Sequence, residues 1–405
     1  MRILIVSNAY LPSISGVVTS IALMRQALIR AGHEVFIFAP RYKKFHDTEP
    51  GIYRFPAIDL TKQFELSLAI PLKPLMKRTM YEIMPDIIHS QHPVVMGSLA
   101  ASFACELDIP LVFTYHTRYA EYAQHYLHTT SGLVKAVANR IVSKYLQHCN
   151  HIIAPTPSIR SLILEQHKPL SPVSVIPTPV DFSDYDKPAP YPVRTRLGLD
   201  PACELLLYFG RFSDEKNLDF LLRAFVQIHH SRPLTRLVLL GRGPIEPALR
   251  RMAKQLGISE QVIFPGAIPH AEVPHYARAA DCFVFPSLTD TQGLVLIESM
   301  AAGTPVVAVD SPSSMDILGE GGGILTPPEE GEFAQAVIGL LQDRPQLLRL
   351  GNIARQIVQR YNITTTGSKL VEVYRQALLP KENNTPENRS DRQKQPPNPA
   401  GTTQA

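Results

Sequence analysis

The sequence has no tryptophan and only four cysteines in 405 residues. Cys105, Cys149, Cys203 and Cys282 are far apart and form no CxxC or mixed Cys/His ligand spacing, so we expect neither a disulfide framework nor a zinc site. No apolar run approaches the ~18 residues that a membrane-spanning helix needs, and the apolar run at residues 3–6 is too short for a signal peptide. We therefore expect a protein of a reducing compartment that is neither secreted nor embedded in a bilayer.

Strong charge of either sign is also missing. The net charge is +4, which is too mild to indicate a nucleic-acid partner. Residues 1–180 contain 17 basic and 11 acidic residues, a net charge of +6, whereas residues 181–405 contain 23 basic and 25 acidic residues, a net charge of −2. The basic character therefore lies in the first half of the chain.

The composition is that of a folded globular protein, with 45% hydrophobic and 19% charged residues. These proportions exclude a wholly disordered or collagen-like chain. A chain of this length exceeds what one hydrophobic core usually serves, so two domains are expected.

The first half has the pattern of an open parallel α/β sheet. Residues 3–6 are apolar at every position, which is typical of a strand covered on both faces. A polar loop follows, then helical spacing of apolar residues over 17–30 and a second strand at 34–38. This order predicts a βαβ unit, with further strands at 86–89, 111–114 and 151–155.

A connector rich in proline spans residues 173–194 and resists both helix and central strand, so the domain boundary is placed between residues 180 and 181. A second βαβ series follows, with strands at 205–209, 236–240, 261–265, 282–286 and 305–308 and a helix at 218–229. Residues 380–405 are polar and are expected to be disordered. Both halves therefore predict doubly wound domains, which tend to bind ligands at the carboxyl ends of their strands.

Two loops in the second half combine glycine with basic residues. Residues 210–217 follow an apolar strand, open a helix, and place Arg211 and Lys216 where a diphosphate is favoured. Residues 239–244 run from a strand into a glycine turn. Neither loop matches GxGxxG or GxxxxGK[ST], so the ligand is not specified, and a solvated loop or a plain tight turn remains open for each.

Residues 285–305 carry the sharpest pattern. A strand ends near Pro286, a polar turn follows, and a helix runs from about Gly293 to Gly303. Asp290 precedes this helix and Glu298 lies inside it, eight residues later. Such carboxylates accept hydrogen bonds from sugar hydroxyls, although a helix cap and a surface charge are the alternative.

This segment resembles the acidic-x7-acidic motif of glycosyltransferase family four, whose members are retaining, use nucleotide sugars, and have the GT-B fold of two Rossmann-like domains facing a central cleft. The first acid of that motif is commonly Glu, whereas here it is Asp290. The resemblance covers roughly residues 1–375. It implies a donor site formed by Gly16, Arg211, Lys216, Gly241, Gly243, Gly266, Asp290, Gly293, Leu294 and Glu298.

The same resemblance implies the remaining roles. His116 joins Arg211, Lys216 and Asp290 as a catalytic group, and Tyr10, Thr19 and Thr117 are expected at the acceptor. No metal and no cofactor are expected, because the nucleotide sugar is a substrate. The string Asp184-Tyr185-Asp186 lies in the connector and is treated as incidental. The GT-B fold also implies that a helix near 358–379 crosses back onto the first domain, with a bend at Tyr361-Asn362.

Residues 7–20 and 289–294 are further similar to enzymes that glycosylate diacylglycerol lipids. The expected reaction is transfer of glucose or galactose from a UDP-sugar to diacylglycerol or its monohexosyl derivative. Phosphatidylinositol or a soluble sugar as acceptor, a sulfolipid-precursor donor, and a non-catalytic nucleotide-sugar-binding subunit remain alternatives.

Residues 66–84 mix apolar side chains with Lys73, Lys77 and Arg78, which suits an anionic membrane surface as well as a helix packed on the core. Tyr119, Tyr122 and Tyr126 have helical spacing and fit either the acceptor entrance or the core. We expect a peripheral enzyme on the cytoplasmic face of a membrane.

Overall fold

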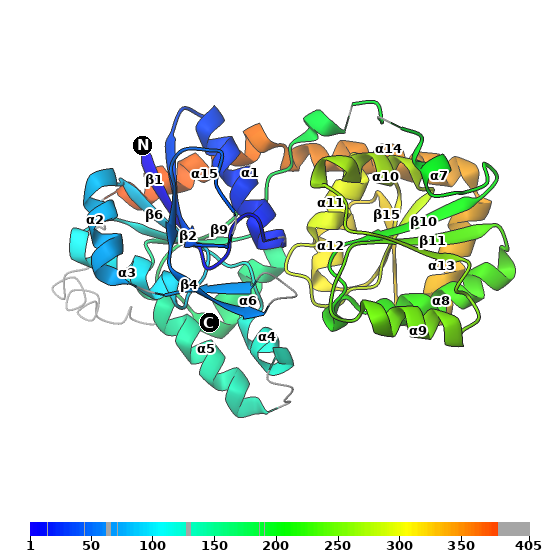
Figure 1. Cartoon of the computed structure of the whole chain (residues 1–405), viewed down its shortest axis with the longest axis horizontal. Coiled ribbons are helices and arrows are strands. Elements are labelled where there is room, and N and C mark those ends of the chain that lie inside the picture. Colours follow the sequence, from blue (N-terminus) through cyan, green and yellow to red (C-terminus); the bar gives the residue numbers. More distant parts are fainter. Residues whose placement is uncertain are drawn as a thin grey trace, which may run out of the picture.

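The computed structural model describes residues 1–13, 15–43, 45–61, 66–70, 72–126, 131–185, 187–189 and 191–379, without the side chains of residues 59–61, 66–69, 125 and 126. The expected disordered tail at 380–405 and Asp186 of the connector lie outside the described residues. The described chain forms two α/β bodies side by side, each with its own sheet (Figure 1).

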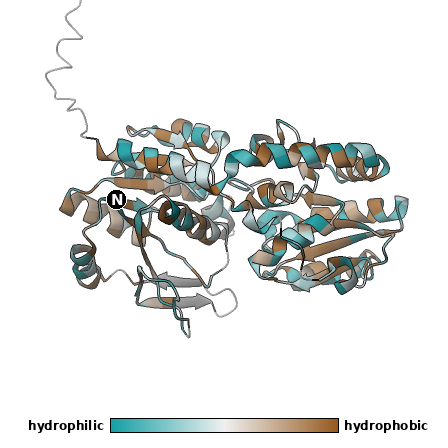
Figure 2. Ribbon diagram, turned by 90° about the horizontal axis from the view of Figure 1, so that it is seen from above, coloured by the Kyte–Doolittle hydropathy of each residue, from teal (hydrophilic) through white to brown (hydrophobic). Residues whose placement is uncertain are grey.

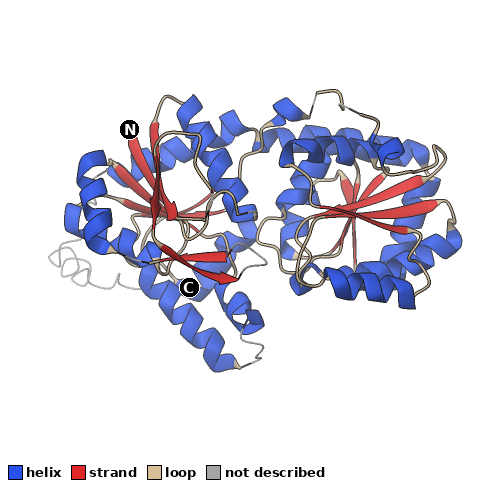
Figure 3. Ribbon diagram, in the orientation of Figure 1, coloured by secondary structure: helices blue, strands red, loops and turns tan. Residues whose placement is uncertain are grey.

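The first body contains a seven-stranded sheet in the order β3-β2-β1-β6-β7-β8-β9, with every neighbouring pair parallel. The central strands are short and fully buried, as expected where helices cover both faces (Figure 3). A separate antiparallel pair is formed by β4 (Ala57–Thr61) and β5 (Leu66–Ala69). The sheet strands are β1 (Arg2–Val6), β2 (Glu34–Pro40), β3 (Ile52–Phe55), β6 (Ile87–Ser90), β7 (Leu111–Thr114), β8 (His151–Ala154) and β9 (Val173–Val175).

The helices of the first body are α1 (Gly16–Arg30), α2 (Lys73–Ile83), α3 (Met96–Leu107), α4 (Tyr119–Tyr126), α5 (Gly132–Leu146) and α6 (Pro157–His167). Ser15 caps α1, because its side chain accepts a hydrogen bond from the Val18 amide. In Figure 2 the strands of the main sheets are largely in the hydrophobic colour, whereas the helices alternate between hydrophobic and hydrophilic residues. Burial of the hydrophobic helix residues against the sheet is the main force that holds each layer in place.

The second body contains a six-stranded parallel sheet in the order β12-β11-β10-β13-β14-β15. Its strands are β10 (Glu204–Phe209), β11 (Thr235–Leu240), β12 (Val262–Gly266), β13 (Cys282–Phe285), β14 (Val306–Val309) and β15 (Gly323–Thr326). Its helices are α7 (Val193–Arg196), α8 (Leu218–Ser231), α9 (Glu246–Gln255), α10 (Val273–Ala279), α11 (Leu294–Ala301), α12 (Pro312–Leu318), α13 (Glu330–Gln342) and α14 (Arg344–Ile357), with single 3-10 turns η1 (Phe182–Asp184), η2 (Asp214–Lys216) and η3 (His270–Glu272).

Two segments pass between the bodies and are bonded to each other. Val180 pairs with Asn362, with the Val180 amide 2.8 Å from the Tyr361 carbonyl oxygen. After α14 and η4 (Val358–Tyr361), the chain bends at Asn362 and α15 (Ile363–Leu378) lies against α1 of the first body (Figure 1). A Cβ at Gly367 would be 3.0 Å from that of Ala27, so the two helices approach closely.

The connector differs in part from expectation. Residues 173–175 form β9, an edge strand and not the central strand that the prolines were expected to resist, whereas the short helix α7 at residues 193–196 begins inside the stretch expected to resist helix. An edge position tolerates the neighbouring prolines because one side of the strand needs no partner. The region 66–84 also divides into two elements, β5 and α2.

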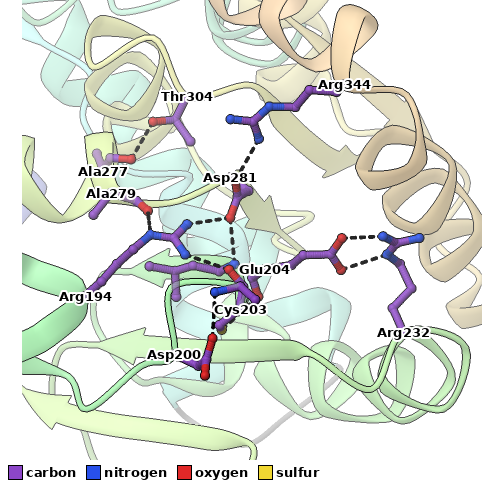
Figure 4. Close-up of polar contacts among 12 residues, drawn as sticks. Arg194, Asp200, Cys203, Glu204, Arg232, Ala277, Ala279, Asp281, Thr304 and Arg344 are labelled. Carbon is purple, nitrogen blue, oxygen red and sulfur yellow. Dashed lines mark hydrogen bonds and ion pairs between the residues drawn. The ribbon is translucent and has the colours of Figure 1, made fainter.

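The amino ends of the second sheet are held by a charged network around Asp281 (Figure 4). The Asp281 carboxylate accepts hydrogen bonds from the Leu205 amide at 2.9 Å, from Arg194 at 2.6 Å and from Arg344 at 3.0 Å. Asp281, Arg194 and Arg344 line a cavity of about 580 Å³. The cavity therefore lies at the end of the second sheet opposite the loops that follow the carboxyl ends of its strands.

Candidate functional site

In the first body, loops that follow neighbouring strands gather at one edge. Gln91 follows β6 and His116 follows β7, and the Gln91 Oε1 lies 2.7 Å from the His116 Nε2. The loop after β1 joins them, because the Asn8 amide donates to the His92 Nδ1 at 3.2 Å. The loops after β1, β6 and β7, which are neighbours in the sheet, therefore form one polar cluster.

His116 is a neutral side chain in this cluster. Burial, with smaller contributions from the nearby His92 and His89, lowers the pKa of its imidazole to about 3. A neutral imidazole binds a sugar hydroxyl by hydrogen bonding and supplies no positive charge. The Gln91 Nε2 is buried and has no hydrogen-bond partner among the described residues, so a donor remains unused beside His116.

The residues expected at the acceptor differ in their placement. Thr19 and Thr117 are half-buried. Gly16 is the exposed first residue of α1, with open space where a Cβ would lie. Tyr10, however, is only 1% exposed, and the Arg54 guanidinium lies 5.5 Å from the centre of its ring. The structure thus makes Tyr10 a core residue and does not offer its side chain to an acceptor.

In the second body, the glycines at 241 and 243 are required by contact between two loops. A Cβ at Gly241 would be 1.9 Å from the Gly210 carbonyl oxygen, and a Cβ at Gly243 would be 1.9 Å from that of Phe212. The Phe212 amide also donates to the Arg242 carbonyl at 3.0 Å. The loops after β10 and β11 are therefore locked together, a reason for glycine that is independent of any ligand. Gly266 ends the adjacent strand β12.

Lys216 and Asp290 form an ion pair between the loops after β10 and β13. Their side chains are 20% and 16% exposed. The Asn217 side-chain amide donates to the Pro286 carbonyl at 3.1 Å and supports the contact between the loops. The Asp290 Oδ2 is buried without a hydrogen-bond partner among the described residues. Arg211 lies exposed on the same loop as Lys216.

Glu298 is buried on α11 and pairs with His270, whose Nε2 lies 2.6 Å from the Glu298 Oε1. The glutamate raises the pKa of this histidine above its ordinary value. Gly293 precedes the helix with a φ of 69° and no side-chain cap, so the first amides of α11, including that of Leu294, receive no capping side chain. Positive helix-terminal amides and a buried carboxylate thus occur on one short helix.

The loop of Asp290 also reaches the first body. The Gln292 Oε1 accepts a hydrogen bond from the Thr178 amide at 3.0 Å, and the Thr178 hydroxyl bonds to that of Ser20 on α1 at 3.0 Å. The Thr156 hydroxyl, after β8, lies 3.4 Å from the Thr291 carbonyl oxygen. The acidic loop of the second body therefore lies directly against the first body, near the start of α1.

Sequence analysis missed Gln91, His270 and Gln292. Gln91 and His270 had a detectable signal, because each follows a predicted strand at its carboxyl end. Gln292 had a weaker one, since it lies between two motif residues, Asp290 and Gly293.

Among the described residues, no group of three His, Cys, Asp or Glu side chains is arranged to hold a metal ion. Across the same ranges, no helix is both long and apolar enough to cross a bilayer.

Comparison with known protein families finds a matching family profile for each of the two bodies. The profile described as Glycosyltransferase Family 4 matches residues 14–184, and that described as Glycosyl transferases group 1 matches residues 194–357. The chain is 33% identical over 320 residues to the alpha-monoglucosyldiacylglycerol synthase of Streptococcus pneumoniae, covering 77% of this chain and 72% of that protein. It is 30% identical over 322 residues to the synthase of the same name from Acholeplasma laidlawii, covering 76% of this chain and 80% of the relative.

Solved structures show the same fold at lower identity. Sucrose-phosphate synthase from Thermosynechococcus elongatus superposes with a TM-score of 0.77 at 23% identity, covering 93% of this chain and 98% of that structure. Anabaena HepE in complex with UDP-glucose gives a TM-score of 0.73 at 19% identity, covering 92% and 98%. The fold expected from the sequence, GT-B with two Rossmann-like domains, is confirmed. With both family profiles matched in order along the two bodies, the chain belongs to glycosyltransferase family four and is a glycosyltransferase.

Proposed function

We propose that this enzyme transfers a hexose, glucose or galactose, from a UDP-sugar to a membrane glycerolipid, either diacylglycerol or monohexosyl-diacylglycerol, in glycolipid synthesis. The observation that carries the donor side is the junction of Lys216, Asp290 and the uncapped start of α11 at the carboxyl ends of adjacent strands. A cation and helix amides suit a diphosphate, and a carboxylate suits sugar hydroxyls. The acceptor is supported by two relatives, 33% and 30% identical to this chain, which are both alpha-monoglucosyldiacylglycerol synthases.

In the proposed reaction, the bond between the anomeric carbon and the diphosphate oxygen breaks as the acceptor hydroxyl oxygen bonds to that carbon on the same face. The acceptor proton passes to the departing phosphate oxygen. Negative charge grows on the diphosphate, so the main task of the protein is to stabilise it. Arg211, Lys216 and the N-terminus of α11 supply positive charge there.

The remaining residues hold the donor. Asp290 accepts hydrogen bonds from sugar hydroxyls and Glu298 from those of the ribose. His116, kept neutral by burial, bonds to the sugar from the first body. No protein nucleophile and no cofactor beyond the nucleotide sugar take part in this proposal. Gly16 at the start of α1 leaves room for the phosphates to approach the backbone.

A lipid acceptor requires the first body to meet a membrane, and two of its helices have suitable surfaces. Helix α2 buries Met76 and Met80 in the core but exposes Leu75 and Tyr81, so it is both a packed helix and an apolar surface. Its Lys77 pairs with Glu106.

Helix α5 projects from the body (Figure 1) and exposes Leu133, Val137 and Ile141 at 73%, 50% and 48%, four residues apart on one face. It contains no acidic residue, and Arg140 and Lys144 are exposed. We propose that this surface binds anionic lipid on the cytoplasmic face of the membrane.

The test is transfer of labelled hexose from UDP-glucose and UDP-galactose, separately, into lipid extracted from vesicles. The vesicles contain diacylglycerol or monohexosyl-diacylglycerol, with and without anionic lipid. Labelled glycolipid in wild type and its loss in Lys216→Met support the proposal. Label found only in phosphatidylinositol or only in a soluble sugar would overturn the proposed acceptor. Turnover found only with a sulfosugar nucleotide would overturn the proposed donor. Binding of UDP-sugar with no transfer or hydrolysis would indicate a non-catalytic subunit.

Docking is tested separately by vesicle flotation. Ile141→Glu on the exposed face of α5 is expected to reduce binding to anionic vesicles, while transfer to a detergent-dispersed acceptor stays within about twofold. Leu170→Glu is the matched control, because Leu170 is 97% exposed but lies outside α5. Equal flotation of Ile141→Glu and wild type would exclude α5 as the docking surface.

A further inference from the structure

We infer that His270 is a positioning residue that holds the Glu298 carboxylate in the orientation needed by the donor, and that its charge makes donor affinity depend on pH. The inference rests on the proposed role of Glu298 in binding the nucleotide ribose. It adds a residue outside the acidic-x7-acidic motif to that site.

The first reason is the environment of Glu298. Its side chain is 6% exposed, and a buried carboxylate is costly unless a donor or a cation pairs with it. The His270 Nε2 supplies that partner at 2.6 Å from the Glu298 Oε1. A carboxylate with one oxygen fixed cannot rotate freely, so the other oxygen is held in a defined direction.

The second reason is where His270 lies. It comes from η3, just after β12 and Gly266, whereas Glu298 comes from α11 after β13. The His270 side chain is 59% exposed although its partner Glu298 is buried. The pair therefore extends from the interior to the surface, at the edge of the sheet that carries the other proposed donor residues. An ion pair placed only for stability would not need to open toward this edge.

The charged groups around His270 determine the sign of the pH effect. Glu298 and, more weakly, Asp184 raise the pKa of His270, while Lys187 is bonded to Asp184 and offsets part of its charge. The Tyr185 hydroxyl faces Glu298, and burial keeps its pKa well above the ordinary value, so it stays neutral.

On α10, which follows η3 directly, His275 lies 2.8 Å from Arg278. Burial and that arginine lower the pKa of His275, so it adds no charge near neutral pH. Among the described groups beside Glu298, His270 is therefore the one whose charge changes as pH passes through its raised pKa.

Because its pKa is raised, His270 is protonated below that pKa and loses its charge as pH rises through it. Loss of the positive charge on His270 weakens its interaction with the Glu298 carboxylate. The KM for UDP-sugar is therefore expected to rise with pH over the range in which His270 titrates, while kcat at saturating donor changes little. UDP-glucose or UDP-galactose is the suitable probe, because a doubly esterified diphosphate has no ionisation of its own near neutral pH.

The experiment measures KM and kcat from ~pH 6 to 9 for wild type and two variants, with thermal unfolding as the check on folding. His270→Gln keeps an N–H donor without a titrating charge, so its KM is expected to be flat across this range. His270→Ala is expected to give a KM that is also flat with pH but roughly tenfold above the wild-type value at the acid end of the range, because a hydrogen bond to a charged group is lost. His230→Gln, on the exposed end of α8, is the matched control and keeps the wild-type profile.

A wild-type KM profile in His270→Gln, or an unchanged KM in His270→Ala, would overturn the inference. Glu298→Gln separates this failure from that of the proposed function. If Glu298→Gln raises KM but the His270 variants do not, only the role of His270 fails. If Glu298→Gln leaves KM unchanged, or neither UDP-sugar binds the wild type, the donor assignment fails and the inference with it.

Discussion

Asp290→Asn is expected to strengthen the binding of UDP while it weakens catalysis. Lys216 is paired with Asp290, so a diphosphate that binds Lys216 must first open this pair. Asparagine has the shape of aspartate without the charge, and Lys216 would then be available to the diphosphate without that cost. The change also removes a negative charge that repels the ligand.

The expected magnitude follows from the burial of the pair. With 20% and 16% of the side chains exposed, the pair lies between an exposed pair, worth up to about 1 kcal/mol, and a buried one, whose disruption costs about 3–5 kcal/mol. A value of about 1–2 kcal/mol is reasonable, and it corresponds to roughly 5- to 30-fold tighter binding of UDP. Turnover of UDP-sugar should nevertheless fall by about 10²-fold, because a charge-assisted contact to the sugar is lost.

Isothermal titration calorimetry with UDP provides the assay, in a double-mutant cycle with Lys216→Met. In the Lys216→Met background, Asp290→Asn should improve UDP binding much less, since only the direct repulsion is then relieved. Equal or weaker binding of UDP to Asp290→Asn than to wild type would refute the reasoning. It would mean that Lys216 and the diphosphate do not compete for the same interaction.

Other consequences concern stability. Gly243→Ala is expected to destabilise the second body by about 1–3 kcal/mol, because the new methyl group would overlap the neighbouring loop. Gly16→Ala is the control and should leave the unfolding midpoint in urea nearly unchanged. Equal midpoints for the two variants would contradict this prediction. Tyr374→Phe removes the hydroxyl 2.7 Å from the His89 Nδ1 and should cost about 1–3 kcal/mol, visible as a lower melting temperature. The folded-state pKa of His89 and of His116 is lowered to about 3, so each contributes stability that is present above pH 6.5 and is lost as pH falls toward 3. The expected loss is about 1.4 kcal/mol per pH unit for each histidine. Urea titrations at several pH values measure this slope, and a stability that does not change with pH would contradict the prediction.

The strands that were predicted most accurately are those with a continuous apolar run. Residues 111–114 were expected as a strand and form β7 with the same bounds, because all four side chains are buried between helical layers. The edge strand β15 was missed: it begins at Gly323 and has three half-buried residues, so its pattern is weak. The pairing of β4 with β5 was missed as well, since an isolated antiparallel pair has no repeat in the sequence.

Motif residues were placed correctly on loops after strands, but their partners were not predictable. Lys216 and Asp290 are 74 residues apart, and Gln292 meets Thr178 across 114 residues. Local spacing contains no information on which loops meet. The same limit applies to Tyr10: the family resemblance implied a place for it at the acceptor, yet Arg54 from β3 lies over its ring.

The pairs that sequence analysis missed change what a binding measurement means for this enzyme. The two carboxylates that we propose bind the donor are largely withdrawn from water, which is costly for an unpaired charge, and Asp290 is paired with Lys216 and Glu298 with His270. In the proposed site, donor binding exchanges one set of partners for another, and its free energy is the difference between the two sets of contacts. Under this proposal, a residue that does not touch the donor, such as His270, alters donor affinity as a residue of the motif does, and the motif alone does not predict the affinity of the site.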